Sequence, residues 1–333
     1  MQAMTFAPKP KATEERLQQI KNAAAGLAPG ATSRIHPQIQ GRDSYYGLPA
    51  LKPPVWTWEV PLYFFVGGIS GVSECLAFVA QIFRAEDALI RTLLWMALIG
   101  AAICPALLIA DLGRPSRFLN MLRVFKLQSP MSMGAWILVV FSGCAFLSLV
   151  SHELILRGFT GIPFVAARWL GEFSGAITGL LLAGYTGVLI GATAIPVWLH
   201  NRKILPAHFL TSGLGGAAAI LELLGFLIPT TQILGFASAG IEAVMELLFE
   251  VRKPIVNAPL HHGKSGTAFR IAGLLEGPIA LLLRFFWGTS PNGRYAAAIC
   301  FLAGSLLSRY VWIWAGRLSA SDVTTQFASQ RRG

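Results

Sequence analysis

Long apolar segments alternate with short polar ones along most of this chain. From about Trp56 onward the apolar segments last about 20 residues, the length that an α-helix needs to cross the hydrocarbon core of a membrane. A β-barrel would show short alternating strands instead. The pattern therefore predicts an all-α integral membrane protein with eight transmembrane helices, at 60–83, 88–110, 131–150, 171–199, 207–229, 232–251, 268–287 and 295–315.

The polar ends of the chain divide it into three regions. Residues 1–55 are rich in proline, which restrains the backbone, and they lack the apolar core of a signal peptide. We expect this extension to be partly extended or disordered, followed by a membrane domain at 56–316 and a short polar tail at 317–333. Composition agrees with the membrane assignment, because only 13% of the residues are charged, whereas soluble proteins have about 25%.

The net charge of +11 could indicate nucleic-acid binding, but in a membrane protein it is more simply a signal of topology. With eight spans, the two termini and the 111–130 loop share a side, and Lys and Arg are concentrated there. We therefore expect a multi-pass protein of the cell's inner (plasma) membrane with both termini in the cytoplasm. The residues assigned to the opposite side are Arg84, Arg91, Arg157, Arg168, Arg284 and Arg294.

The positions of cysteine and histidine argue against a bound redox centre. An iron–sulfur cluster needs several thiolates close together, whereas each cysteine lies in a different part of the sequence, inside a predicted span. No histidine falls in the middle of a span, where haem would need a pair. We expect no haem, no iron–sulfur cluster and no metal in this chain. The cysteines are Cys75, Cys104, Cys144 and Cys300.

The 111–132 segment places an acid and several basic residues between two apolar segments. Charges at the edge of a bilayer must be solvated, paired or docked against a partner. We expect Asp111 to brace the loop by pairing with Arg114 or Arg117, and Ser132 to cap the third helix.

The basic residues of this loop form a candidate docking surface. Arg117, Arg123 and Lys126 would suit an acidic partner protein, since complementary charge sets docking rate and register. Anionic lipid headgroups are the alternative ligand.

Three segments of the chain resemble the NrfD-like, or polysulfide reductase, family: the entry to the first helix at 46–71, the loop at 111–136 and the fourth helix at 185–198. The resemblance covers residues 45–315. It implies two four-helix bundles and a membrane subunit that exchanges electrons between quinone or quinol and a ferredoxin-like iron–sulfur subunit, which in turn serves a catalytic subunit. The chain would then be an enzyme only as part of that complex. Relatives often dock their partner on the outer face, whereas the charge pattern here places that face inside.

Quinol oxidation releases two protons, so the site needs a proton acceptor, neutral hydrogen-bonding groups and an apolar slot. Glu59 is the first candidate for the acceptor, because it opens the first span among aromatic residues. A simple ion pair between Glu59 and Arg114 is the alternative. The predicted catalytic residues are Glu59 and Asp111, and the predicted quinone-binding residues are Trp56, Glu59, Tyr63, Arg114, Asn120 and Ser129.

Several ionisable residues fall deeper in the predicted spans, where charge is costly and usually functional or paired. Glu242, Glu246 and Glu250 recur on one helical face. Such acids could form a proton path or structural pairs with Arg270 and Arg309, and both readings stay open. The candidate proton path consists of Glu74, Glu222, Glu242, Glu246, Glu276 and Arg309.

Two other functions are compatible with the sequence. The buried acids would suit a proton or solute transporter that works without a redox partner. A membrane anchor that binds its complex but not quinone is the second alternative.

Overall fold

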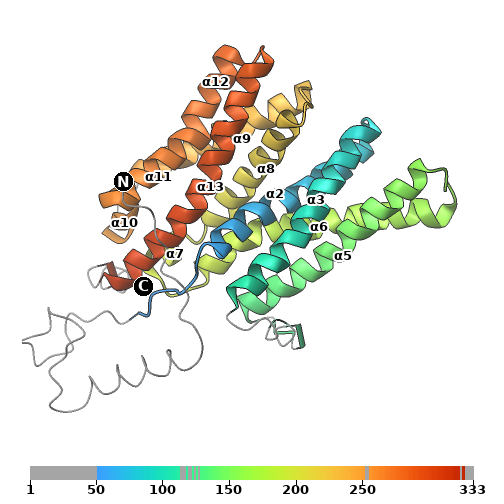
Figure 1. Cartoon of the computed structure of the whole chain (residues 1–333). Coiled ribbons are helices and arrows are strands. Elements are labelled where there is room, and N and C mark those ends of the chain that lie inside the picture. Colours follow the sequence, from blue (N-terminus) through green and yellow to red (C-terminus); the bar gives the residue numbers. More distant parts are fainter. Residues whose placement is uncertain are drawn as a thin grey trace, which may run out of the picture.

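The structure, a computed structural model, describes residues 51–112, 118, 122–123, 125–126, 128–251, 255–322 and 325–326. These residues form long helices that run roughly along a common axis, and they contain no strand, as the all-α prediction requires (Figure 1). The helices are α2 Glu59–Ile82, α3 Asp87–Asp111, α5 Pro130–Leu156, α6 Ile162–Gly191, α7 Pro196–His200, α8 Leu205–Leu223, α9 Pro229–Val251, η2 Ile255–Asn257, α10 Ala258–His261, α11 Gly263–Leu274, η3 Leu275–Ile279, α12 Ala280–Trp287 and α13 Pro291–Ser321.

Six helices in the described part of the chain are long and apolar enough to cross a membrane: α2, α3, α5, α6, α9 and α13. This confirms a membrane protein with several spans. The predicted span at 207–229 overlaps the short, glycine-rich helix α8. The predicted span at 268–287 overlaps α11, η3 and α12, which follow one another as a single rod. The count of eight spans stays a prediction.

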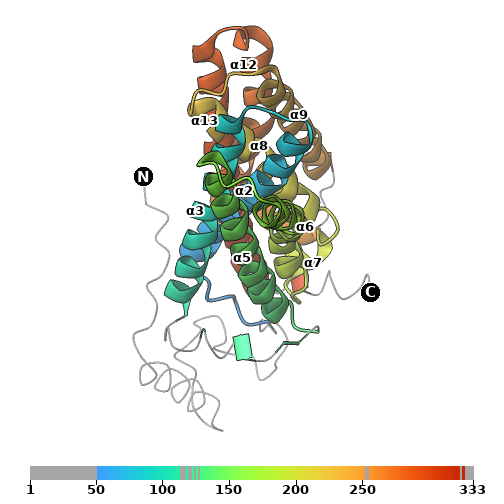
Figure 2. The same ribbon diagram turned by 90° about the vertical axis from the view of Figure 1, so that its right-hand side faces the viewer.

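The helices form two groups that lie side by side (Figures 1 and 2). The first group contains α2, α3, α5 and α6, and the second contains α8, α9, α13 and the α11–η3–α12 rod. Helix α2 packs against α6 of its own group and against α8 of the other. Glycines permit the closest of these contacts, since a Cβ on Gly71 would lie 2.2 Å from the backbone oxygen of Gly179 in α6.

The fourth predicted segment, 171–199, was wrong at both ends. Helix α6 begins nine residues earlier, at Ile162, and stops at Gly191; a turn then leads into α7. The Thr193 hydroxyl donates to the backbone oxygen of Ile190 at 2.8 Å, and Pro196 has no amide hydrogen to continue the helix.

The prediction that Ser132 caps the third helix was also wrong. Ser129 is the N-cap of α5, and its hydroxyl accepts a hydrogen bond from the Ser132 amide at 3.4 Å. Pro130 occupies the first helical position, where its fixed φ suits a helix start and no amide is needed. The Ser132 hydroxyl instead accepts from the backbone amide of Lys126 at 3.1 Å.

A buried ion cluster joins three helices of the second group. Arg284 of α12 donates to both carboxylate oxygens of Glu222 in α8, at 2.8 and 2.7 Å. Arg294 of α13 donates to Glu222 Oε1 from Nε at 3.0 Å and from Nη2 at 2.7 Å. Both arginines are buried and bonded to Glu222, although the charge count placed them with the residues of the opposite side of the membrane.

The close α2–α6 contact predicts that Gly71→Ala destabilises the fold. The added methyl would collide with the Gly179 backbone, and overpacking of this kind costs about 1–3 kcal/mol. We expect a lower thermal unfolding midpoint in detergent. Gly184→Ala is the matched control, since a methyl there meets no atom within 4 Å. Equal midpoints for the two variants would contradict this packing.

The ion cluster predicts that Glu222→Gln is severely destabilising. The change leaves two buried guanidinium groups without their counter-ion, and breaking a buried pair costs about 3–5 kcal/mol. The same substitution at Glu153 breaks a pair with the exposed Arg91, which is worth about 0–1 kcal/mol. Chemical denaturation of both variants checks the difference. A Glu222→Gln protein as stable as Glu153→Gln would show that the cluster is not needed.

Candidate functional site

A pocket of about 590 Å³ lies in the first helical group, at the end where α3 stops and α5 begins. This volume includes space open to solvent, and most of the pocket surface is aliphatic or aromatic. The carboxylate of Asp111 and the hydroxyls of two tyrosines are its main polar groups. The lining residues are Trp56, Val60, Tyr63, Phe64, Leu108, Asp111, Leu112, Phe118, Met131, Gly134, Ala135, Tyr185 and Leu189.

Tyr185 of α6 forms one wall of this pocket, and Gly134 of α5 makes its position possible. A Cβ on Gly134 would lie 2.1 Å from the tyrosine ring, so a larger residue would displace the ring. The Tyr185 hydroxyl donates to the backbone oxygen of Pro130 in the first turn of α5. The ring is therefore held by packing and by a hydrogen bond.

Trp56 also lines the pocket and is braced through α7 by α13 of the second helical group. Its ring stacks on Trp198 of α7, with centroids 5.4 Å apart and an angle of 15° between the planes. The Trp198 indole in turn donates to the backbone oxygen of Trp312 in α13 at 2.8 Å. Phe64 meets Trp56 edge-on at 6.4 Å. The pocket wall is thus part of the packing between the two helical groups.

Three of the predicted site residues, Trp56, Tyr63 and Asp111, come together as lining of the pocket. Glu59 is not among the lining residues, although its neighbour Val60 is. Its carboxylate is buried and accepts a hydrogen bond from the Thr57 hydroxyl.

The other residues predicted for the quinone site and the docking surface are a helix cap, two exposed residues and three residues outside the described part of the chain. Ser129 caps α5 and does not line the pocket. Arg123 and Lys126 are exposed at the end of the molecule where the pocket lies. The remaining three, Arg114, Arg117 and Asn120, lie outside the described residues, as do the ion pairs expected of Arg114 and Arg117.

The residues grouped as one proton path belong to three different sets of contacts. Glu74 accepts a hydrogen bond from the Ser148 hydroxyl at 2.6 Å and interacts electrostatically with Glu172, all within the first group. Glu222 belongs to the ion cluster with Arg284 and Arg294. The rest, Glu242, Glu246, Glu276 and Arg309, surround His208 in the second group.

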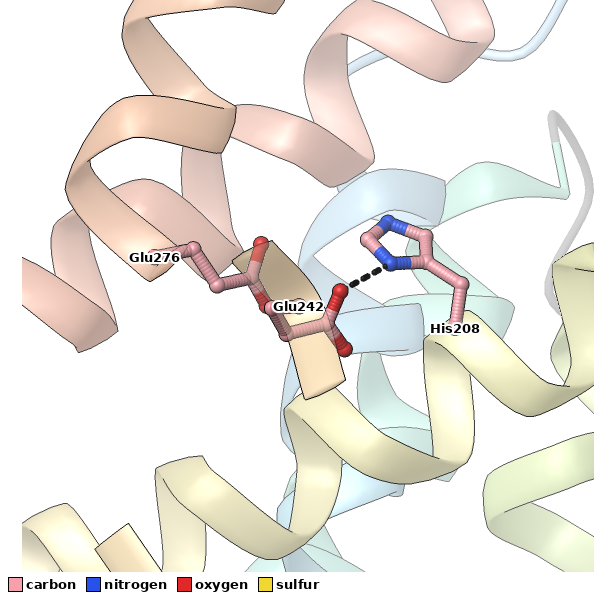
Figure 3. A group of neighbouring side chains, drawn as sticks. All are labelled: His208, Glu242 and Glu276. Carbon is pink, nitrogen blue, oxygen red and sulfur yellow. Dashed lines mark hydrogen bonds and ion pairs between the residues drawn. The ribbon is translucent and has the colours of Figure 1, made fainter. Parts of the chain in front are cut away.

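His208 is the functional candidate that sequence reasoning missed. Its Nδ1 lies 2.6 Å from Glu242 Oε2 (Figure 3), and its Nε2 lies 3.0 Å from the Ser308 hydroxyl of α13. It is buried near the start of α8, close to a loop in the sequence, so the apolar pattern gave no sign of its burial. The local sequence indicates the burial of His208 only in that the residue lies in an otherwise apolar, glycine-rich segment.

Arg309 lies beside this histidine and is held by α8. Its guanidinium stands 3.8 Å from the centroid of the Phe209 ring and donates to the Phe209 backbone oxygen at 3.2 Å and to the Ser212 hydroxyl. The Phe209 ring lies 6.0 Å from that of Phe64, which lines the large pocket. The buried polar cluster is therefore one aromatic layer behind the pocket wall. The structural pair left open for Arg270 is found with Glu250, whose carboxylate lies 3.6 Å from the guanidinium.

Comparison with known proteins agrees with this architecture. The family model described as polysulphide reductase, NrfD matches residues 49–245, which include all lining residues of the large pocket and more than half of the chain. Protein NrfD of Escherichia coli (strain K12) is 29% identical over 280 residues, which are 78% of this chain and 80% of that protein. This chain, with its several membrane-spanning helices, therefore belongs to the polysulphide reductase NrfD family.

Proposed function

We propose that the protein is the membrane subunit of an oxidoreductase complex in the inner membrane, with its termini in the cytoplasm, and that the pocket beside Asp111 binds the headgroup of a quinone or quinol. The observation that supports this proposal most strongly is a largely apolar, aromatic-lined pocket that has Asp111 among its lining residues. Electrons would pass between this headgroup and an iron–sulfur subunit, and then to a catalytic subunit.

The shape and chemistry of the pocket suit a quinone ring. A quinone is a flat ring with two polar oxygens, and the rings of Trp56, Tyr63 and Tyr185 offer it apolar and aromatic surface. Asp111 provides the hydrogen-bonding group for one oxygen. The isoprenoid tail would leave along the apolar side chains of Leu108 and Leu189.

Oxidation of quinol breaks two O–H bonds, forms two C=O groups and releases two electrons and two protons. Asp111 lines the pocket and accepts the first proton in this proposal. Glu59, buried next to the lining residue Val60, is the second acceptor. The two electrons reduce the partner's clusters, and quinone reduction reverses every step.

The iron–sulfur partner would dock at the same end of the molecule. Arg123 and Lys126 are exposed there and give that end a positive surface suited to an acidic protein. Docking at this end would bring the partner's clusters near the headgroup.

A second candidate function is proton transfer across the membrane, alone or coupled to the quinone reaction. Glu74 and Glu172 favour it, because both are buried in the same helical group as the pocket, toward the other end of α2 and α6. A transporter that works alone would move protons without quinol. A plain anchor would tolerate changes throughout the pocket.

The proposed acceptor role predicts that Asp111→Asn slows quinol oxidation by about 10²-fold or more, as expected when a general base is removed. Glu59→Gln should slow it as well. The measurement is the rate at which anaerobically added quinol reduces the partner's clusters, followed by EPR in the intact complex. Asp87→Asn is the matched control, since Asp87 begins the same helix at its opposite end. Wild-type rates in Asp111→Asn would exclude the acceptor role.

The docking surface predicts that the double change Arg123→Glu and Lys126→Glu slows association with the iron–sulfur partner and reduces its dependence on salt. Arg157→Glu, at the opposite end of α5, is the control. Association rates can be measured with this subunit in nanodiscs. Unchanged association together with weaker binding to anionic lipid would assign these residues to headgroups instead.

A further inference from the structure

A second, smaller pocket lies in the other helical group, between α8, α9, α11, η3 and α13. The proposed quinone reaction makes no use of it. His208, Glu242, Glu246, Glu276 and Ser308 contribute the polar part of its wall. So many ionisable groups in an apolar interior need a partner, because burying charge is expensive.

Three of these side chains converge. Ligand atoms of His208, Glu242 and Glu276 lie within 4.8 Å of one another, and all three residues are buried (Figure 3). Oε1 of Glu242 and Oε1 of Glu276 are shut off from solvent and accept no hydrogen bond from the described residues. These two oxygens are therefore available to a ligand.

The helical backbone around Glu276 is distorted. This residue lies in η3, Leu275–Ile279, a single π-helical segment within an otherwise α-helical rod. Pro278 removes one amide donor there, and π-helical segments of this kind are frequent at functional sites. Gly304 of α13 makes room, since a Cβ on it would lie 2.6 Å from the Glu276 backbone nitrogen.

Carboxyl groups outnumber cationic groups around this pocket. Glu242, Glu246 and Glu276 line it, and the guanidinium of Arg309 interacts with Glu242 and Glu276. Arg270 lies 3.6 Å from Glu250 and also interacts with Glu246. Oxygen ligands of this kind suit a divalent cation.

We propose that His208, Glu242 and Glu276 bind a divalent transition-metal ion of the Zn²⁺ or Mn²⁺ kind. An imidazole together with carboxylates suits these ions, whereas Ca²⁺ and Mg²⁺ favour ligand sets made of oxygen alone. In the tautomer that carries its proton on Nε2, this nitrogen donates to the Ser308 hydroxyl and the Nδ1 lone pair faces the Glu242 carboxyl group. The ion would take the place of the proton between Nδ1 and Glu242 and would hold α8, α9 and η3 together.

The test is metal binding by the full-length protein purified in detergent. Elemental analysis should find about one Zn or Mn per chain, and the protein stripped with a chelator should take up Zn²⁺ or Mn²⁺ again. Glu276→Gln and Glu242→Gln should each weaken this uptake at least about tenfold, as loss of a ligand requires. Glu74→Gln, the same change in the other helical group, should bind like wild type.

Three results would overturn the proposal: no ion above background in the wild type, equal uptake by Glu276→Gln, or an infrared band of a protonated carboxyl group that Glu276→Gln removes while no metal binds. The last of these results would show that the cluster holds a proton and not a metal ion. If the variants do not fold, the test uses the wild-type protein after its metal has been removed with a chelator. Adding Zn²⁺ or Mn²⁺ should then raise the thermal unfolding midpoint, and an unchanged midpoint would refute the site. Quinol turnover enters none of these readouts, so the result is independent of the proposed function.

Discussion

The cost of placing charge in an apolar interior is the constraint on which this structure depends. Glu222 has two arginines, and Arg309 has the Phe209 ring, a backbone carbonyl and a hydroxyl. Each of these partners comes from a different helix than the residue it contacts. The ionic contacts therefore fix how α8, α12 and α13 are arranged, while glycine contacts such as Gly71–Gly179 set how closely the other helices approach.

The two helical groups place their ionisable residues differently, and each contains one pocket. The first helical group keeps a pocket at one end, where Asp111 can reach both the pocket and the surface. The second group gathers most of its acids around His208. An aromatic layer that includes Phe64 and Phe209 separates the two sites, and the stacked pair Trp56 and Trp198 ties them into one packed unit.

Sequence patterns predicted the features that depend on local composition. Apolar length located the helices, and the aromatic entry to α2 with Asp111 at the end of α3 identified three lining residues. The patterns failed where a residue's environment is built by distant helices. Arg284 and Arg294 were counted with the charges of one membrane side because each lies near the end of a predicted span, yet both donate to Glu222 in the interior of the bundle. His208 joins Glu242 and Ser308 only after three helices have packed.

The most direct test of the central claim is to find where quinone binds. A photoreactive quinone analogue can be cross-linked to the protein in its native membrane, and the labelled peptides mapped by mass spectrometry. If quinone binds in the pocket beside Asp111, labels will lie near Asp111, Met131 and Tyr185 and will be lost when unlabelled quinone competes. Competable labels confined to the second helical group, or no competable label at all, would contradict binding in this pocket.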